Sequence, residues 1–268
     1  MERGRLHRLR KRVRRPSRRV YSAASRVPGA LGDEPSSRVV PAPRAAASRG
    51  ATRMILRQDP LGHDLPDDPL FVRIADDLEQ RGLTILPDAL PGPLGHDLVQ
   101  ALQGLEASDF HRAGIGREAR RDLNSFVRRD RIHWIEDQPA SWLAWTERLR
   151  LFLNRRLLLG LFSFESHFAI YDPGAFYRRH LDAFRGAPNR VLSLIVYLNH
   201  GWQPDDGGEL VIHDDAVSIR VTPAFGTLVL FLSDRFPHEV LTAARKRYSV
   251  AGWFRLNASI GDRLDPPE

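Results

Sequence analysis

Two residues in the stretch YDPGAFYRRHLDAFRG, residues 171–186, could bind a metal ion together. His180 and Asp182 stand two positions apart, shortly after a Pro-Gly turn. If this segment is a β-strand, residues two apart point to the same face, so an imidazole and a carboxylate can meet at one ion. His213 and Asp215 have the same spacing in VIHDDA, so spacing alone does not choose between the pairs.

A third ligand distinguishes the two pairs, because two protein ligands hold a divalent ion poorly. His238, in DRFPHEV, is expected at the start of a later strand. Four strands fit between Asp182 and His238, enough to bring the chain back beside the first pair. Only two strands fit between His213 and His238, and Asp215 falls in a turn. We therefore predict that His180, Asp182 and His238 are the metal ligands.

Two imidazoles and one carboxylate on one side of an ion form the triad of non-haem Fe(II) oxygenases. The opposite side of the ion stays open for a chelating cosubstrate and dioxygen. A closed structural site would use four ligands and leave no open position. The chain has no cysteine, which excludes disulfides, thiolate metal sites and a cysteine nucleophile.

A basic residue follows the third ligand at a suitable distance to face the same pocket. Arg247, in ARKRYSVAGWF, heads the last apolar strand, whereas Arg245 and Lys246 have the character of turn residues. A guanidinium in that position can bind a carboxylate through two parallel hydrogen bonds. The alternative is an ordinary surface arginine in a chain rich in arginine.

The C-terminal part of the chain predicts a mainly β fold. Short apolar segments alternate there with turn signals such as DPG, RGAPN, QPDDGG and TPAFG. Eight strands within about ninety residues predict a jelly-roll, in which two sheets face each other around a pocket. The expected strands cover residues 165–173, 176–182, 190–199, 208–213, 218–222, 227–232, 238–242 and 247–256.

Residues 68 to about 160 are expected to be mainly helical and to support the β core. Apolar residues recur at helical spacing in three segments, and LTIL between the first two predicts a short strand. His96 and His133 have no partner at ligand spacing, so we expect surface or hydrogen-bonded histidines there. The three predicted helices cover 67–82, 91–105 and 139–161.

The basic character of the chain is concentrated in its first 53 residues. This segment holds fifteen Lys and Arg against three acidic residues, whereas the rest holds 25 against 30. We expect the segment to be disordered, because it has too little apolar surface to offset the entropy of ordering. It could be a transit peptide, a basic arm for nucleic acid, or an upstream extension of a protein that starts at Met54. The chain is accordingly divided into a tail (1–53), a helical support (54–160), a β core (161–257) and a C-terminal tail (258–268).

The C-terminal third resembles the Fe(II)- and 2-oxoglutarate-dependent dioxygenases, in particular the prolyl-4-hydroxylase-like branch with its SM-20-related bacterial members. The resemblance rests on YDPGAFYRRHLD, VYLN, GGEL, FLSDRFPHEV and RYSVAGWF, over roughly residues 160–256. It implies a double-stranded β-helix, another name for this jelly-roll. It also implies that Arg247, with Tyr197, binds the distal carboxylate of 2-oxoglutarate. Tyr171, Leu210 and Trp253 would line the cosubstrate and substrate pocket.

The resemblance implies a hydroxylase that uses Fe(II), 2-oxoglutarate and dioxygen and releases succinate and CO2, with ascorbate as a candidate reductant. Its implied substrate is a prolyl residue of a protein or peptide. A small-molecule hydroxylase, a nucleic-acid demethylase and a non-catalytic jelly-roll sensor for a metal or a small acid remain as alternatives. We expect the slightly acidic core not to bind nucleic acid stably. With no run of eighteen apolar residues, we expect no membrane-spanning helix and a cytoplasmic protein.

Overall fold

The structure is a computed structural model that describes residues 68–113, 126–183, 189–215 and 217–257. The predicted disordered tail over residues 1–53 and the predicted C-terminal tail over 258–268 lie outside these residues. The description below therefore concerns the predicted β core and most of the helical support in front of it.

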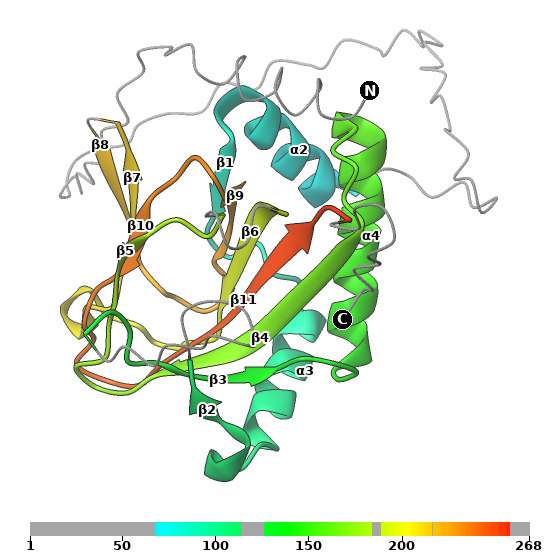
Figure 1. The fold of residues 1–268 in the computed structure, drawn as a ribbon. Coiled ribbons are helices and arrows are strands. Elements are labelled where there is room, and N and C mark those ends of the chain that lie inside the picture. Colours follow the sequence, from blue (N-terminus) through cyan, green and yellow to red (C-terminus); the bar gives the residue numbers. More distant parts are fainter. Residues whose placement is uncertain (1–67, 114–125, 184–188, 216, 258–268) are drawn as a thin grey trace, which may run out of the picture. The chain divides into compact units, whose positions relative to one another are not determined.

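Two antiparallel sheets form the core of the fold (Figure 1). The larger sheet has the strand order β1-β9-β6-β11-β4-β3-β2, and the smaller one β5-β10-β7-β8. Four of the eight predicted strands lie in each sheet, as a jelly-roll requires, so the predicted fold class is confirmed. These eight strands are β4 (Ser163–Tyr171), β5 (Tyr177–His180), β6 (Arg190–Tyr197), β7 (Leu210–Asp214), β8 (Val217–Val221), β9 (Leu228–Leu232), β10 (His238–Val240) and β11 (Arg247–Arg255).

Three further strands from the N-terminal region extend the larger sheet at both edges. The predicted strand β1 (Leu83–Leu86) pairs with β9 at one edge. At the other edge β3 (Arg131–Trp134) pairs with β4, and the two-residue β2 (His111–Arg112) pairs with β3. The region before residue 160 thus contains helices, as predicted, but also completes the sheet on which the core is built.

Three helices pack on the larger sheet and on one another. They are α2 (Pro69–Arg81), α3 (Gly92–Gln103) and α4 (Ala140–Leu157). Figure 1 shows α2 and α4 on the side of this sheet that faces away from the smaller sheet. Their apolar residues are buried at helical spacing, so the amphipathic pattern that predicts them reflects real burial.

The ends of these helices follow from local chemistry. Asp68 caps α2 by accepting a hydrogen bond from the Leu70 amide, and Gly82 ends it in the left-handed conformation at φ 74°. The third helix is shorter than the predicted range of 139–161. Leu158 turns left-handed at φ 56°, and the Asn154 side chain binds both backbone groups of Leu161.

A tryptophan pair fixes α4 against the larger sheet. Trp142 is fully buried and stacks on Trp145 with 5.6 Å between ring centroids. Its indole Nε1–H donates to the Ser166 hydroxyl on β4 at 3.0 Å. The hydrogen bond lets a large indole be buried without an unpaired donor, so helix and sheet are held in a defined register.

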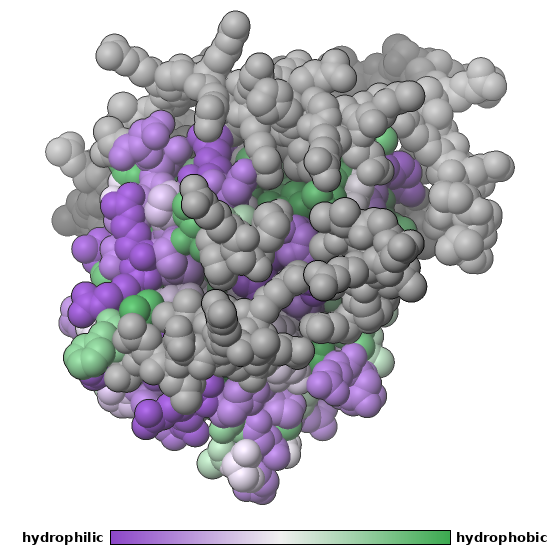
Figure 2. All heavy atoms as spheres, in the orientation of Figure 1, coloured by the Kyte–Doolittle hydropathy of each residue, from purple (hydrophilic) through white to green (hydrophobic). Residues whose placement is uncertain are grey.

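The surface of the described part is mainly hydrophilic on the face that Figure 2 shows, with smaller hydrophobic areas between. Few large apolar side chains of the described residues are exposed. Three of them lie in α4 or shortly after its end, and the full set is Phe126, Leu151, Leu158, Phe162 and Val217. Among the described residues, no helix is both long enough and apolar enough to cross a bilayer.

Gly252 in the central strand β11 is expected to tolerate no side chain. A Cβ atom there would lie 2.6 Å from the Phe164 ring and 2.7 Å from the Glu165 carbonyl oxygen. We expect Gly252→Ala to lower the free energy of unfolding by about 1–3 kcal/mol, because backbone and ring must move apart. Gly92→Ala is the control, since no atom lies within 4 Å of its added methyl group. Urea unfolding of both variants and the parent measures the difference, and equal stabilities would contradict the packing argument.

Candidate metal centre and active-site cavity

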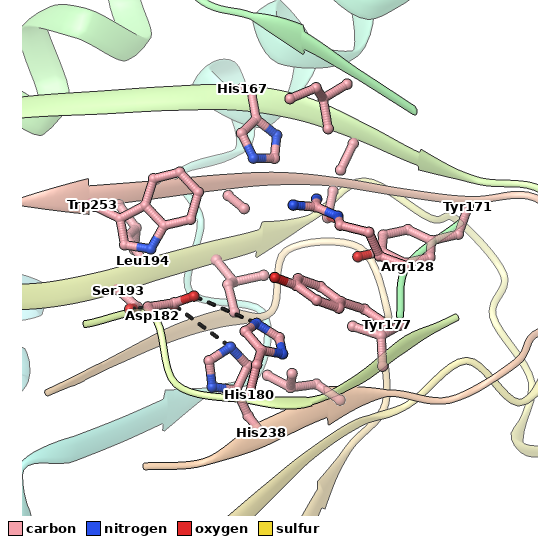
Figure 3. Close-up of a pocket in the computed structure, with 18 of the residues that line it drawn as sticks. Arg128, His167, Tyr171, Tyr177, His180, Asp182, Ser193, Leu194, His238 and Trp253 are labelled. Carbon is pink, nitrogen blue, oxygen red and sulfur yellow. Dashed lines mark hydrogen bonds and ion pairs between the residues drawn. The ribbon is translucent and has the colours of Figure 1, made fainter. Parts of the chain in front are cut away.

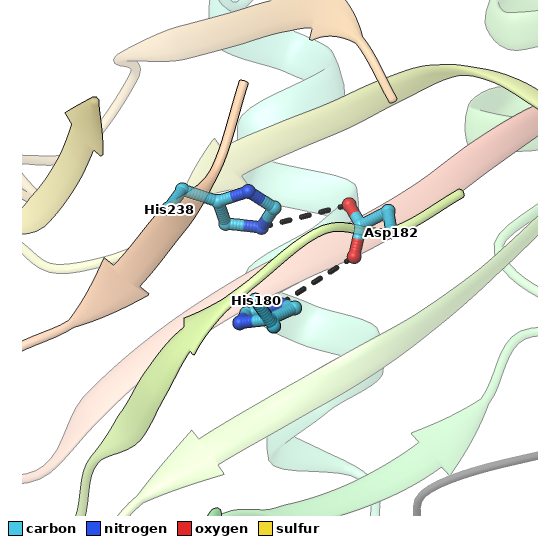
Figure 4. Close-up of side chains that lie close together, drawn as sticks. All are labelled: His180, Asp182 and His238. Atoms are coloured by element: carbon cyan, nitrogen blue, oxygen red, sulfur yellow. Dashed lines mark ion pairs between the residues drawn. The ribbon is translucent and has the colours of Figure 1, made fainter. Parts of the chain in front are cut away.

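His180, Asp182 and His238 converge in the space between the two sheets (Figure 4). Each offers one ligand atom, and these atoms all lie within 4.8 Å of one another. His180 on β5 and His238 on β10 are direct partners across the antiparallel pair, which places both imidazoles on the same face. The structure therefore brings together all three residues that the sequence predicts as ligands.

Each imidazole is oriented by its own backbone. Nδ1 of His180 lies 2.8 Å from the Arg178 carbonyl oxygen, and Nδ1 of His238 lies 3.0 Å from that of Phe236. If Nδ1–H donates in both rings, both Nε2 atoms carry a free lone pair. These atoms lie 3.5 and 3.6 Å from the two carboxylate oxygens of Asp182. Such fixed tautomers are typical of metal-binding histidines.

Asp182 reaches the site in a different way from the one predicted. The strand was expected to continue to residue 182, but β5 ends at His180 and Asp182 lies in the bend that follows. The alternation of side chains along a strand thus does not explain its position. Its carboxylate is held instead from the larger sheet, because the Ser193 hydroxyl on β6 donates to Oδ2 at 2.6 Å.

The electrostatics of the three residues suit a divalent cation. Burial would raise the pKa of the Asp182 carboxyl, but His238, His180 and the more distant Arg190 together hold it well below its usual range. Burial lowers the pKa of His238 to about 4, only partly opposed by the Asp182 charge. At neutral pH the site therefore combines a carboxylate with a neutral His238 imidazole, both able to donate electron pairs.

The competing pair, His213 and Asp215, is not assembled into a site. His213 lies at the end of β7, where its Nε2 is 3.0 Å from Glu239 and its Nδ1 is 2.9 Å from the Ser218 hydroxyl. Asp215 lies in the turn after β7, with φ 49°. The prediction that this aspartate falls in a turn is confirmed.

A cavity of about 160 Å³ opens between the sheets beside the three converging residues (Figure 3). In that view His167 and Trp253 lie on one side of it and His180 and His238 on the other. Of the predicted site residues, Tyr197 alone does not line it; its ring lies beside Arg247 instead. The predicted residues that line it are Tyr171, His180, Asp182, Leu210, His238, Arg247 and Trp253.

Arg247 begins β11 and is 2% exposed, so it is not a surface arginine. Its guanidinium carbon lies 4.8 Å from the Tyr171 ring centre and 4.9 Å from that of Tyr197. Its Nε donates to the Gly208 carbonyl oxygen at 2.9 Å. Gly208 has φ 70°, and a Cβ there would meet Ala243 at 2.8 Å. A glycine at this position of the GGEL motif lets the backbone come close enough to hold the arginine.

Two buried polar groups lie side by side here, Arg247 in the cavity wall and Tyr197 beside it. Arg247 donates to the Gly208 carbonyl oxygen and the Ser249 hydroxyl, but no carboxylate among the described residues lies within ion-pair distance of it. The buried Tyr197 hydroxyl beside it makes no well-formed hydrogen bond. A buried cation is costly unless it is paired. A ligand carboxylate would supply both missing interactions. The residues present therefore fit 2-oxoglutarate, which could reach from Arg247 to a metal ion at the three converging residues.

Several cavity residues have no counterpart in the sequence-based prediction. Trp134 comes from the unpredicted strand β3, where the alternation in RIHW gives a period-two signal. His167 lies in an apolar strand, and burial with the charge of Arg128 lowers its pKa to about 4, so it is neutral. No sequence signal marks Ser193. Arg128 and Arg190 also line the cavity, paired with Asp130 and Glu165.

Comparison with known proteins agrees with this geometry. Residues 166–255 match the 2OG-Fe(II) oxygenase superfamily. A prolyl-4-hydroxylase from Pseudomonas putida is 41% identical, with a TM-score of 0.64, over 70% of this chain and 100% of that one. A prolyl hydroxylase from Trichoplax adhaerens, solved with a fragment of the hypoxia inducible factor oxygen degradation domain, is 27% identical, with a TM-score of 0.62, over 69% and 89%.

A prolyl 4-hydroxylase from Phytophthora capsici shares the fold, with a TM-score of 0.55 at 24% identity over 69% of this chain and 64% of that one. The identity to the bacterial enzyme over its whole length, the superfamily match and the converging His-Asp-His residues all agree. The protein therefore belongs to the 2OG-Fe(II) oxygenase superfamily, as a prolyl-4-hydroxylase-like dioxygenase that uses Fe(II), 2-oxoglutarate and dioxygen.

Proposed function

We propose that this dioxygenase hydroxylates prolyl residues of a protein or peptide. One observation carries the assignment of its site: the three converging ligand residues and the unpaired Arg247 lie in the same cavity. In the proposal, His180, Asp182 and His238 hold the iron, and Arg247 binds the distal carboxylate of 2-oxoglutarate. Tyr197 completes that binding with its unpartnered hydroxyl.

The cavity wall opposite the proposed iron ligands has the chemistry to receive a ring without polar donors. Trp134 and Trp253 lie there with 6.5 Å between ring centroids, and Ile132 adds an aliphatic surface. A prolyl residue has an apolar ring and no amide N–H, so it can pack on such a wall without losing a hydrogen bond. The similarity to the Pseudomonas putida and Trichoplax adhaerens prolyl hydroxylases supports this choice of substrate.

When bound, iron and 2-oxoglutarate supply the oxidising chemistry, in which the 2-oxo acid yields succinate and CO2 and one oxygen atom enters the substrate. The protein supplies the geometry. The two backbone-oriented imidazoles and the Asp182 carboxylate would hold the metal. Arg247 fixes the far end of the cosubstrate, and its burial keeps water from competing for that carboxylate. The two indoles would hold the substrate ring on the cavity wall opposite the proposed iron ligands.

The alternatives differ from this proposal in what they would release or bind. A small-molecule hydroxylase would use the same iron and cosubstrate residues with another substrate. A non-catalytic sensor would bind metal or acid without releasing succinate. The absence of stable nucleic-acid binding by the core, the use of ascorbate and a cytoplasmic location all stay predictions.

Asp182→Ala is expected to abolish Fe(II)- and oxygen-dependent succinate release and to leave the protein folded. Asp182 is 8% exposed, and removing a buried carboxylate does not leave a cavity lined by large apolar groups. His213→Ala is the control, since it removes only the contacts to Glu239 and Ser218. Succinate is measured with saturating 2-oxoglutarate, and folding by circular dichroism. Normal turnover in Asp182→Ala, or inactivation by His213→Ala, would show that the ligands are assigned to the wrong pair.

Arg247→Ala is expected to raise the Michaelis constant for 2-oxoglutarate by roughly two orders of magnitude. Truncating one partner of a buried charge pair costs about 2–5 kcal/mol, because the other charge is left unpaired. Arg247→Lys should recover part of the loss, since an ammonium cannot reproduce the planar fork. Iron affinity should hardly change.

Arg245→Ala is the control for the arginine. Arg245 is largely exposed, lies 3.4 Å from Asp206 and contacts the Trp202 ring at the surface. Titration of 2-oxoglutarate into each iron-loaded variant measures the effect. Equal affinity in Arg247→Ala and Arg245→Ala would remove the assignment of Arg247 to the cosubstrate.

The choice of substrate is tested separately, by treating a proteome digest with the enzyme and searching for peptides that gain one oxygen atom. We expect the gain on prolyl residues with the parent and not with Asp182→Ala. A gain restricted to another residue type, or none on peptides together with turnover of small molecules, would replace the prolyl assignment.

A further inference from the structure

We infer that Ser193, supported by Ser233, is a positioning residue that sets which carboxylate oxygen of Asp182 faces the metal. The inference rests on the proposed iron site. It is based on two buried hydroxyl groups of the larger sheet that are hydrogen-bonded in series: Ser233 contacts Ser193, and Ser193 contacts the proposed ligand Asp182. Ser193 and Ser233 are 1% and 0% exposed, so neither hydroxyl is held in place by bulk water.

Asp182 needs such support because its own backbone does not orient it. His180 and His238 belong to paired strands, and each ring is held by the carbonyl of the residue two positions earlier. Asp182 lies beyond the end of β5, in a bend. A short acidic side chain in a bend can rotate about χ1 and χ2, and so would present either oxygen or both to an ion.

The direction of the hydrogen bonds follows from the charge on Asp182. An ionised carboxylate can only accept, so the Ser193 hydroxyl donates to Oδ2, at 2.6 Å. That distance is typical of a short, charge-assisted bond. Ser193 has then used its single proton, and its contact with Ser233 at 2.9 Å must be one in which Ser233 donates. The chain of donors therefore runs from Ser233 through Ser193 to Asp182.

Ser233 also holds the backbone next to the ligand. Its carbonyl oxygen accepts a hydrogen bond from the Ala183 amide at 3.1 Å, and its own amide donates to the Val191 carbonyl oxygen at 3.0 Å. One residue at the end of β9 thus anchors the bend after β5 by its main chain and the Asp182 carboxylate through Ser193. The contacts of Ser233 with Ala183 and of Ser193 with Asp182 thus connect the larger sheet to the segment that follows β5 of the smaller sheet.

As a consequence, the two carboxylate oxygens of Asp182 have different roles. Oδ2 accepts the Ser193 hydrogen bond and lies 3.6 Å from the His238 Nε2 atom, whereas Oδ1 lies 3.5 Å from the His180 Nε2 atom and is the oxygen that we assign to the metal. Residues that orient the ligands of a metal typically change its affinity by 10- to 100-fold when they are removed. Ser193 is therefore expected to matter for metal affinity although it donates no ligand atom.

The test measures binding of Mn(II) to the metal-free full-length protein by electron paramagnetic resonance, without 2-oxoglutarate or substrate. Ser193→Thr and Ser193→Val form a matched pair, because the two side chains have the same shape and differ only in the hydroxyl group. Both side chains have nearly the same volume, so any effect of their extra bulk in the cavity wall is shared by the two variants. We expect Ser193→Thr to bind Mn(II) within about threefold of the parent, and Ser193→Val and Ser193→Ala to bind about 10- to 100-fold more weakly.

Ser233→Ala should weaken Mn(II) binding less than Ser193→Ala does, because its side chain acts through the other serine. Combining both changes should give the affinity of Ser193→Ala alone, since a residue that acts only through another adds nothing once that one is gone. Ser166→Ala is the control: Ser166 is also a buried serine, but its hydroxyl accepts from Trp142 on the helix side of the sheet. It should bind Mn(II) like the parent.

Asp182→Ala distinguishes failure of the proposed iron site from failure of the positioning role of Ser193. If it loses Mn(II) while Ser193→Val binds as well as Ser193→Thr, the positioning role is overturned and the iron site stands. If Asp182→Ala binds Mn(II) like the parent, the iron site of the proposed function fails and the inference fails with it. Independent, additive losses from Ser193→Ala and Ser233→Ala would overturn the chain of donors.

Discussion

The direct pairing of His180 with His238 across β5 and β10 is the constraint on which the rest of the site depends. Cross-strand partners on one face of an antiparallel pair have closely spaced Cβ atoms, so the strand register alone brings two imidazoles together. Their ring centroids are 4.2 Å apart. A slip of one residue in this register would turn one ring away from the cavity. The metal centre therefore requires the pairing of the smaller sheet before any ligand chemistry can occur.

The third proposed ligand ties the two sheets to each other. Asp182 belongs to the chain that leaves the smaller sheet, yet its carboxylate is held by β6 of the larger sheet. A metal bound by His180, His238 and Asp182 would thus depend on both sheets and on the distance between them. Behind the larger sheet, α2 packs against β1 and β9, and α4 packs against β4. The helices touch no substrate, but they keep the sheet that carries Arg247 and Ser193 in position.

The charges in the cavity are separated in a way that suits a dicarboxylate. Arg247 and the three converging residues line the same cavity, and Tyr197 lies beside Arg247. The other cationic residues of the wall are balanced locally: Arg128 by Asp130, and Arg190 by Glu165. A ligand with one carboxylate for Arg247 and a second group for a metal would therefore meet little competing charge.

The sequence predicts strands and site residues that depend on local pattern. The eight core strands follow from apolar segments between turn signals. The room for four strands between Asp182 and His238 is enough to choose these residues, with His180, over the competing pair His213 and Asp215. The features that the sequence does not predict depend on pairing between segments that are far apart in the chain. β5 pairs with β10 in an irregular register and ends at His180, and the bend that holds Asp182 cannot be read from YRRHLD. Ser193 is one serine in an apolar strand, and its role emerges only when β6 lies beside that bend.

One short segment joins the two sheets beside the cavity. β5 is an edge strand of the smaller sheet, and the backbone N–H and C=O groups on its outer side need hydrogen-bond partners. Residues 127–129 provide them, through hydrogen bonds between Val127 and Arg178 and between Arg129 and Phe176. The same chain then continues into β3 and pairs with β4 of the larger sheet.

Arg128 lies at the centre of this connection, 4.4 Å from the Tyr177 ring centre and paired through two hydrogen bonds with Asp130. Because Asp130 neutralises it at close range, its positive charge does not compete with Arg247 for a carboxylate. The guanidinium instead packs on the tyrosine that stacks, at 3.6 Å between ring centroids, on His180. The segment that closes the cavity wall thereby also supports one of the proposed iron ligands, so the shape of the entrance and the geometry of the metal centre are linked through a single aromatic ring.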